Sequence, residues 1–182
     1  MTKVDEIARR YFVMNAFDGA LTVLGVMVGS YAAGSPNPRF IVGACIGGAI
    51  AMGVSGFVGA FMAERAERVR RLKELESVLF MKLDHSVLAE AARFAVLFTA
   101  LIDGLSPAFV AVLSIIPFFM ALKGLIAVNL AFLLSLATNL TILFLLGMFL
   151  GRVARENWVL HGLLMVSAGL LTAVICSLFK LF

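Results

Sequence analysis

The stretch "NAFDGALTVLGVMVGSYAAG" (residues 15–34) is apolar enough for the interior of a bilayer, yet it carries a carboxylate. Asp18 stands about one helical turn after Asn15, so the two polar side chains share a helix face. Ionisable side chains in hydrocarbon are costly, and those that persist normally face a partner or a water-filled path. This stretch therefore predicts a membrane helix with a functional polar face.

The same apolar character extends along the whole chain. Of its 182 residues, 62% are hydrophobic and 14% are charged, whereas a soluble domain is about half apolar and about a quarter charged. A transmembrane helix needs about 20 predominantly apolar residues. Five segments meet that requirement: 12–34, 40–63, 94–121, 125–150 and 158–180. The sequence therefore predicts an all-α polytopic membrane protein with five transmembrane helices.

The basic residues predict how these helices are oriented. Of the 15 Lys and Arg residues, only Arg39, Lys123 and Lys180 fall on the side of the predicted membrane opposite the N-terminus. Cytoplasmic loops carry the excess of Lys and Arg in membrane proteins. We therefore expect the N-terminus inside and the C-terminus outside.

A hydrophilic segment, residues 64–93, separates the second and third spans and divides the membrane domain into 1–63, 64–93 and 94–182. Its apolar residues recur every three or four positions, at Val69, Leu72, Leu75, Leu79 and Leu83. That spacing is typical of an amphipathic helix. We expect a cytoplasmic helical segment here, with a break at the polar residues 84–86.

The chain also carries a candidate internal repeat. "FDGALTVLGVMVG" (17–29) in the first span and "IDGLSPAFVAVLS" (102–114) in the third both contain an Asp-Gly pair. The same offset relates the second span to the fourth. The pattern predicts a parallel duplication of a two-helix hairpin followed by a fifth helix, and such repeats are common in transporters.

Several residues could line a transport path through the membrane. Asn15, Asp18 and Thr22 share one face of the first span. The other candidates are Met14 in the same span, Met52 in the second span and Asp103 in the third. Pro107 has no N–H, so the carbonyl of Asp103 loses its helical partner and could act beside its carboxylate. The structural alternatives are a protonated acid that bonds between helices and a simple proline kink.

The candidate metal ligands are Asp18 and three glutamates near the inner end of the second span: Glu64, Glu67 and Glu74. Carboxylate oxygens are suitable ligands for hard divalent cations. Arginines interleave with the glutamates, so a salt-bridged, solvated helix is the alternative. The two cysteines are isolated in apolar runs, which gives no zinc or redox motif.

Two further polar or small patterns predict helix packing. Gly43, Gly47, Ala51, Ser55 and Gly59 recur at every fourth position of the second span. Such a stripe of small residues favours close helix–helix approach in membranes. Asn139 in the fourth span is expected to form a hydrogen bond across helices.

The first span, "AMGVSGFVGAFMAERAE" (51–67) and the proline-containing third span together resemble the vacuolar iron transporter family. The resemblance implies a homodimer in which helix one lines a path between subunits. It implies exchange of divalent metal, ferrous iron and as a second candidate manganese, for protons, in the cell membrane of a prokaryote. The family's first-helix aspartate falls on Asp18. Where the family commonly has an acidic Gly-Glu-Tyr-like motif, this chain has Ser55, Gly56 and Phe57.

The intramembrane acids predict a secondary transporter with Asp18 as the cation and proton site, and the resemblance implies that it exports divalent metal from the cytoplasm in exchange for protons. We expect no enzyme activity, no tightly bound cofactor and no nucleic-acid partner. A membrane enzyme that holds two metals needs further acids soon after Asp18, and the next acid is Glu64. The alternative is a membrane scaffold that binds anionic lipid through the basic 64–93 helix.

Overall fold

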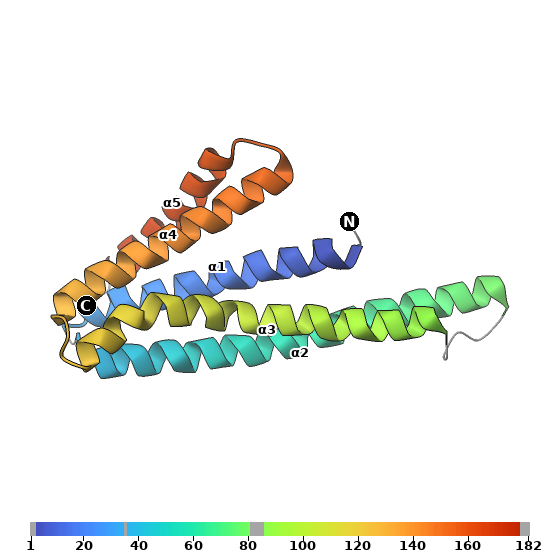
Figure 1. Ribbon diagram of the computed structural model, residues 1–182, viewed down its shortest axis with the longest axis horizontal. Helices are drawn as coiled ribbons and strands as arrows, with labels where there is room; N and C mark the ends of the chain where they lie inside the picture. The colour runs from blue at the N-terminus through green and yellow to red at the C-terminus, as the bar shows by residue number, and fades with distance from the viewer. Residues whose placement is uncertain (1–2, 35, 81–85, 179–182) are drawn as a thin grey trace.

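The computed structural model describes residues 3–34, 36–80 and 86–178, and within these ranges the chain forms five helices (Figure 1). They are α1 (Lys3–Ala32), α2 (Pro38–Leu79), α3 (Val87–Leu122), α4 (Val128–Ala154) and α5 (Trp158–Leu178). Each helix is long and apolar enough to cross a membrane. The predicted all-helical fold, with five helices that could each span a membrane, is therefore confirmed.

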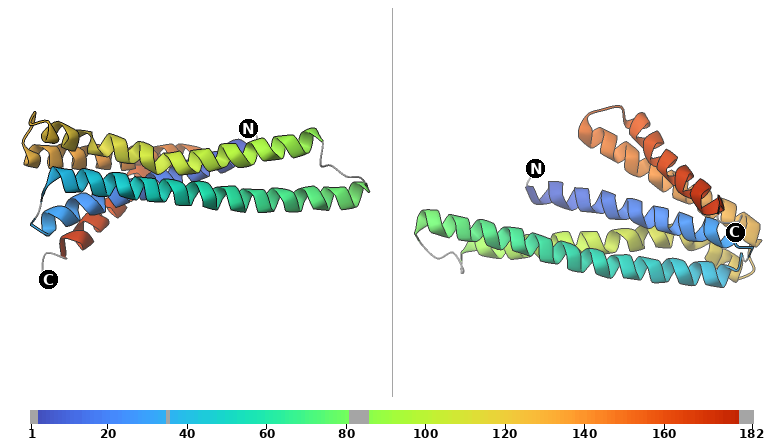
Figure 2. Two further views of the ribbon diagram at one scale, coloured as in Figure 1. Left: turned by 90° about the horizontal axis from the view of Figure 1, so that it is seen from below. Right: turned by 180° about the vertical axis from the view of Figure 1, so that it is seen from behind.

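Helices α2 and α3 are longer than a membrane requires. With 42 and 36 residues, they extend over about 63 and about 54 Å at about 1.5 Å per residue, against a hydrocarbon core of about 30 Å. In its described parts, 64–80 and 86–93, the predicted segment is thus formed by the ends of these two helices. Figures 1 and 2 show these ends running side by side beyond the start of α1.

The start of α3 carries a well-defined cap. The Ser86 side chain accepts a hydrogen bond from the backbone N–H of Ala89 at 3.2 Å, which satisfies one of the free donors of the first turn. This cap agrees with the predicted break at 84–86. Asp84 and His85 lie outside the described residues.

Successive helices run in opposite directions, so the N-terminus, the α2–α3 end and the α4–α5 turn lie toward one end of the molecule (Figure 1). Helix α2 packs mainly on α3, and α1 lies against both. Helices α4 and α5 form a hairpin that joins the others near the α1–α2 loop and splays away from them toward its own turn (Figure 2).

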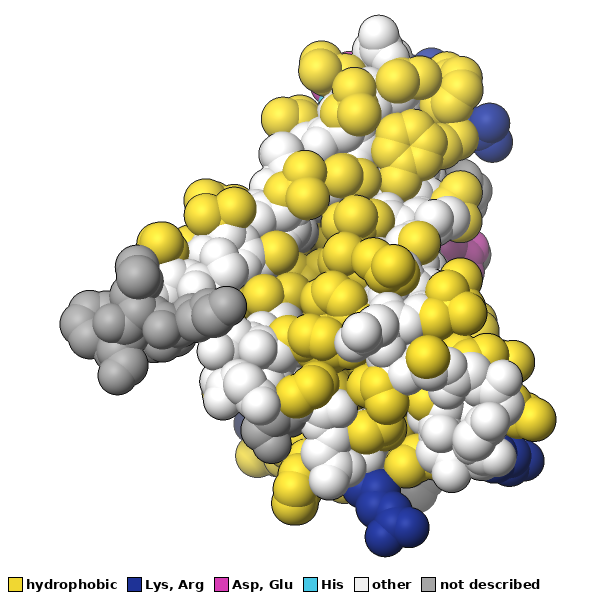
Figure 3. Space-filling model, turned by 90° about the vertical axis from the view of Figure 1, so that its left-hand side faces the viewer, with side chains coloured by type: hydrophobic (Ala, Val, Ile, Leu, Met, Phe, Trp, Pro, Cys, Tyr) yellow, Lys and Arg dark blue, Asp and Glu magenta, His cyan; other side chains and the backbone are white. Residues whose placement is uncertain are grey.

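Apolar side chains are spread over the face of the molecule that carries the α1–α2 loop (Figure 3). Phe40, Leu125 and Leu171 are each more than half exposed. Exposed apolar area on this scale is not found on soluble monomers. It indicates a surface made for lipid.

Glycines set the closest helix crossings. A Cβ atom on Gly53 of α2 would lie 2.8 Å from the carbonyl oxygen of Gly104 on α3, and one on Gly19 of α1 would lie 2.8 Å from Cα of Pro107. The predicted stripe of small residues on α2 does not lie at such a crossing. A Cβ atom on Gly43 or Gly47 would meet no described atom within 4 Å. Helix α2 buries its opposite face, so no described part of this chain packs closely on the stripe.

The predicted duplication stays a prediction. The two Asp-Gly pairs lie near the middle of α1 and α3, and these helices pack against each other through Gly19 and Pro107. Each glycine of the pairs therefore has a packing role of its own, which would account for it without any duplication.

Candidate functional site

Asp103 is the centre of the candidate site. It lies in the middle of α3 with 4% of its surface exposed. The Asn15 side chain, from α1, donates a hydrogen bond from Nδ2 to Oδ1 of Asp103. A buried carboxylate needs such partners because hydrocarbon supplies none. Two polar residues that are 88 positions apart in the chain thus form one contact in the membrane.

Gly56 of α2 provides the space that the second carboxylate oxygen occupies. A Cβ atom at Gly56 would lie 3.1 Å from Oδ2 of Asp103 and 3.4 Å from its main-chain oxygen. That main-chain oxygen has no helical donor, because Pro107 lacks an N–H. The carboxylate and the free carbonyl of Asp103 therefore face the same small residue. The sequence predicted that these two groups lie together, but not that they face Gly56.

Asp18 lies beside this centre on the open side of α1. Its side chain is exposed, and it is close enough to Asp103 for the two charges to interact. Met14, one turn earlier, is 55% exposed. Helices α2 and α5 both contact α1, but they make no extensive contact with each other in the described residues. Asp18 therefore faces outward from a single copy of the chain.

The other path candidates meet on the next turn. Thr22 donates a hydrogen bond from Oγ1 to the sulfur of Met52 at 3.4 Å. Both residues are partly buried between α1 and α2. Of the six predicted path residues, the structure joins Asn15 with Asp103 and Thr22 with Met52, and it leaves Asp18 and Met14 on the adjoining open face.

Tyr11 is a neighbour of the site that was not predicted from the sequence. Its carbonyl oxygen accepts a hydrogen bond from Nδ2 of Asn15 at 3.4 Å. Its phenol lies close enough to Glu64 and Asp103 to interact with their charges. The signal was available, because Tyr11 stands four residues before Asn15 and extends the same polar face toward the N-terminus.

The candidate glutamates on α2 are engaged by arginines. Glu64, which is 8% exposed, pairs with Arg68 at 3.3 Å. Glu67 bonds Arg70 at 3.0 Å and Arg71 at 2.9 Å. Arg70 also reaches Glu74 at 3.5 Å. The salt-bridged helix that the sequence offered as an alternative is therefore present at all three positions.

No three His, Cys, Asp or Glu side chains of the described ranges are grouped in a way that could hold a metal ion. The predicted metal ligands Asp18, Glu64, Glu67 and Glu74 thus do not form one ligand set within a single copy. Asp18 and Asp103, near the middle of α1 and α3, are instead acids that the fold brings close enough for their charges to interact.

Asn139 has the structural role that the sequence predicted. Its Nδ2 donates to the carbonyl oxygen of Ala20 at 3.0 Å and to Oγ of Ser114 at 3.3 Å. The side chain is fully buried and ties α4 to α1 and α3. It fixes the helix beside the site and does not line it.

Comparison with known proteins gives one extensive match. The chain is 34% identical over 178 residues to MJ0645, an uncharacterized protein of Methanocaldococcus jannaschii, and the match covers 96% of this chain and 90% of the relative. No protein-family model matches. No solved structure matches either.

Proposed function

The chain belongs to the family of the archaeal protein MJ0645, and we propose that it is a secondary transporter that exports divalent metal ions from the cytoplasm in exchange for protons. Ferrous iron is the first candidate substrate and manganese the second. The observation that carries the proposal is the pair of acids, Asp18 and Asp103, in the middle of two membrane helices.

The surroundings of Asp103 support a binding role for it. Its carboxylate and its free carbonyl provide hard oxygen ligands in one place, and the Asn15 amide donates to that carboxylate. Thr22 and the sulfur of Met52 follow on the next turn. A thioether is a softer ligand and favours transition metals over magnesium and calcium.

Proton coupling follows from competition at these carboxylates. A protonated carboxyl group loses its charge and most of its affinity for a cation, so proton entry from outside promotes metal release there. Deprotonation on the cytoplasmic side restores the site. Tyr11, Glu64 and Arg68 lie at the cytoplasmic end of the path in this scheme.

The resemblance to vacuolar iron transporters has a physical interpretation at Gly56. The family's acidic motif in helix two corresponds here to Ser55, Gly56 and Phe57. In this chain Oδ2 of Asp103 lies 3.1 Å from where a Gly56 Cβ atom would be. We propose that Asp103 of α3 supplies the carboxylate that α2 lacks.

We further propose that the protein works as a homodimer. A carboxylate that faces lipid is costly, and Asp18 is exposed in a single copy. A second copy placed over the open face of α1 would cover Asp18 and bring two such carboxylates together. The proposed orientation has the N-terminus in the cytoplasm, because the described basic residues gather toward that end of the helices.

Metal flux into proteoliposomes tests the transport proposal. With an imposed pH gradient, the wild type should carry ferrous and manganous ions, and Asp18→Asn and Asp103→Asn should reduce the flux to that of empty vesicles. Glu90→Gln is the matched control, because Glu90 is an exposed acid in the first turn of α3. Wild-type flux by both aspartate variants would refute the role of the acids.

The scaffold alternative makes a different prediction in the same experiment. A protein that only binds anionic lipid would carry no metal ion in either direction, whatever its aspartates. Absence of wild-type flux for ferrous, manganous, cobalt and zinc ions, with the protein correctly inserted, would favour the scaffold.

A further inference from the structure

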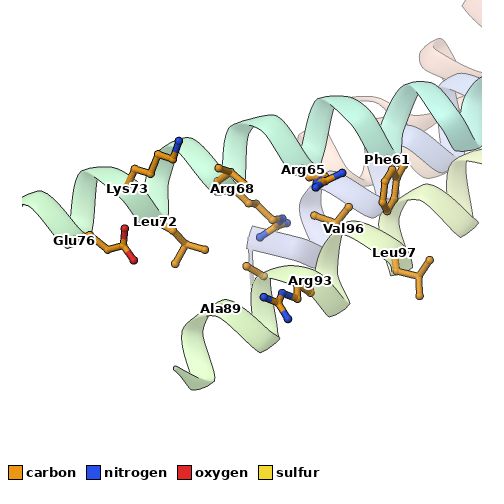
Figure 4. A pocket seen from close by; sticks show the side chains of 12 residues that line it. Phe61, Arg65, Arg68, Leu72, Lys73, Glu76, Ala89, Arg93, Val96 and Leu97 are labelled. Atoms are coloured by element: carbon orange, nitrogen blue, oxygen red, sulfur yellow. The ribbon is translucent and has the colours of Figure 1, made fainter. Parts of the chain in front are cut away.

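A pocket of about 560 Å³ lies between the projecting ends of α2 and α3, away from the aspartate site (Figure 4). One wall is the face of α2 from Phe61 to Glu76, where lining residues recur every three or four positions. The other wall is the face of α3 from Ala89 to Leu97. Of the lining residues, the proposed transport scheme uses only Arg68, which pairs with Glu64 at the cytoplasmic end of the path.

The pocket carries a strong excess of positive charge. Four of its lining residues are basic, Arg65, Arg68, Lys73 and Arg93, against one acid, Glu76. The side chains of Arg65, Lys73 and Arg93 form no ion pair with any residue of the described ranges.

Arg68 is only partly satisfied. One terminal nitrogen pairs with Glu64, but its Nε is buried without a hydrogen-bond partner among the described residues. A buried donor without a partner is costly, and an anion in the pocket could accept from it. Four guanidinium or ammonium groups around one cavity are the arrangement that binds phosphate.

The charge is specific to the pocket face of α2. Arg70 and Arg71 lie on the other side of the same helix, and they are neutralised by Glu67 and Glu74. The basic residues of the outer face are therefore compensated, whereas on the pocket face of the same stretch Arg68 alone among the basic residues forms an ion pair within the described ranges. Such a distribution indicates that the basic residues of the pocket bind an anionic ligand and do not merely keep the surface soluble.

The opposite end of the pocket is apolar. Phe61 of α2 and Val96 and Leu97 of α3 line it, and Figure 4 shows them at the end nearest the membrane-spanning part, with the cations farther out. Leu97 is 47% exposed, so this end is open sideways. An anion without a hydrocarbon tail would leave this half of the pocket unused.

We propose that the pocket is a binding site for an anionic phospholipid of the cytoplasmic leaflet. The phosphate contacts Arg65, Arg68 and Arg93, and the first part of an acyl chain lies against Phe61 and Leu97. Anionic lipids concentrate in that leaflet and attract basic side chains at the membrane surface. The lipid would join α2 to α3 just outside the membrane, and the site does not depend on the transport proposal.

The test compares lipids that differ only in headgroup charge. Purified, delipidated protein is mixed with phosphatidylglycerol or with phosphatidylcholine of the same chains, and bound lipid is counted by native mass spectrometry. The wild type should retain phosphatidylglycerol and little phosphatidylcholine. Arg65→Gln with Arg93→Gln should abolish that preference.

The matched control is Arg70→Gln with Arg71→Gln, which removes the same charge from the same end of the bundle but outside the pocket. It should keep the preference for phosphatidylglycerol. Equal loss in both double variants, or full retention in the pocket variant, would overturn the proposal. Circular dichroism of each variant verifies that the helices are intact.

Inorganic phosphate distinguishes a lipid site from a plain anion site. Millimolar phosphate should leave phosphatidylglycerol bound, and Phe61→Ser with Leu97→Ser should weaken lipid binding. If phosphate displaces the lipid fully and the serine variant binds as well as the wild type, then the apolar half has no part in the site and the lipid assignment is wrong.

Discussion

Asp103 is the residue on which the candidate site depends. It is buried in the middle of a membrane helix. Its carboxylate is accommodated by one hydrogen-bond donor and by the space beside a residue that has no side chain. Asn15 of α1 supplies the donor, and Gly56 of α2 supplies the gap. A larger residue at Gly56 would have to share the volume of the carboxylate. Three helices thus contribute to the position of one side chain.

A double-mutant cycle measures the contact between Asn15 and Asp103. Asn15→Ala and Asp103→Ala, alone and together, should show a coupling free energy of about 0.5–3 kcal/mol, because the two side chains are in direct contact. The measurement is the free energy of unfolding by SDS in mixed micelles. Asn129→Ala combined with Asp103→Ala is the control pair, since Asn129 is exposed at the start of α4, and it should be additive.

At the scale of the element, the five helices are held together in different ways. Helices α4 and α5 cross where Gly147 faces the backbone of His161 and Gly162, and a Cβ atom on Gly147 would lie 2.7 Å from Cα of Gly162. Helix α2 has glycines in two settings. Gly53 meets the backbone of α3, whereas Gly47 has nothing described near it. Glycine content alone does not distinguish these roles.

Alanine substitution should therefore have opposite effects at Gly147 and Gly47. Gly147→Ala forces α4 and α5 apart and should lower the free energy of unfolding by about 1–3 kcal/mol. Gly47→Ala meets no atom and should raise it by up to about 1 kcal/mol, because alanine loses less backbone entropy in a helix. SDS unfolding of both variants measures the difference, and destabilisation of equal size at the two positions would contradict this difference in packing.

At the scale of the whole molecule, a single copy leaves two features facing outward. One is the face of α1 with Asp18 and Met14, between α2 and α5. The other is the small-residue stripe of α2. Lipid covers apolar side chains well, but it does not satisfy a carboxylate. There is therefore a physical reason for a second copy to cover the first face, which carries Asp18.

Cross-linking tests this dimer. In a variant in which Cys45 and Cys176 are replaced by alanine, Met14→Cys should form an intermolecular disulfide upon mild oxidation in the membrane. Ile116→Cys is the control, because Ile116 is also exposed, at 46%, but lies on α3. A monomer band for Met14→Cys together with a monomeric mass in detergent would rule out a dimer through this face.

Much of the fold follows from local sequence. Apolar runs of sufficient length set the five helices, and Ser86 with its capping side chain marks the start of α3. The interleaved Arg and Glu residues of α2 form ion pairs between positions four apart, and this spacing can be recognised in the sequence alone. The cross-helix role of Asn139 was also predictable, since a polar amide in hydrocarbon needs a partner.

The pairing of these elements was decided only by the tertiary structure. Sequence placed Asp18 and Asp103 in the membrane, but it gave no reason for Asp103 to be buried against Gly56 while Asp18 faces outward. It likewise predicted an amphipathic 64–93 segment, but not that its two halves enclose a basic pocket. Hydropathy and helical spacing are properties of one segment. Burial and pocket shape depend on which faces of different helices meet, and that is settled by packing between residues far apart in the chain.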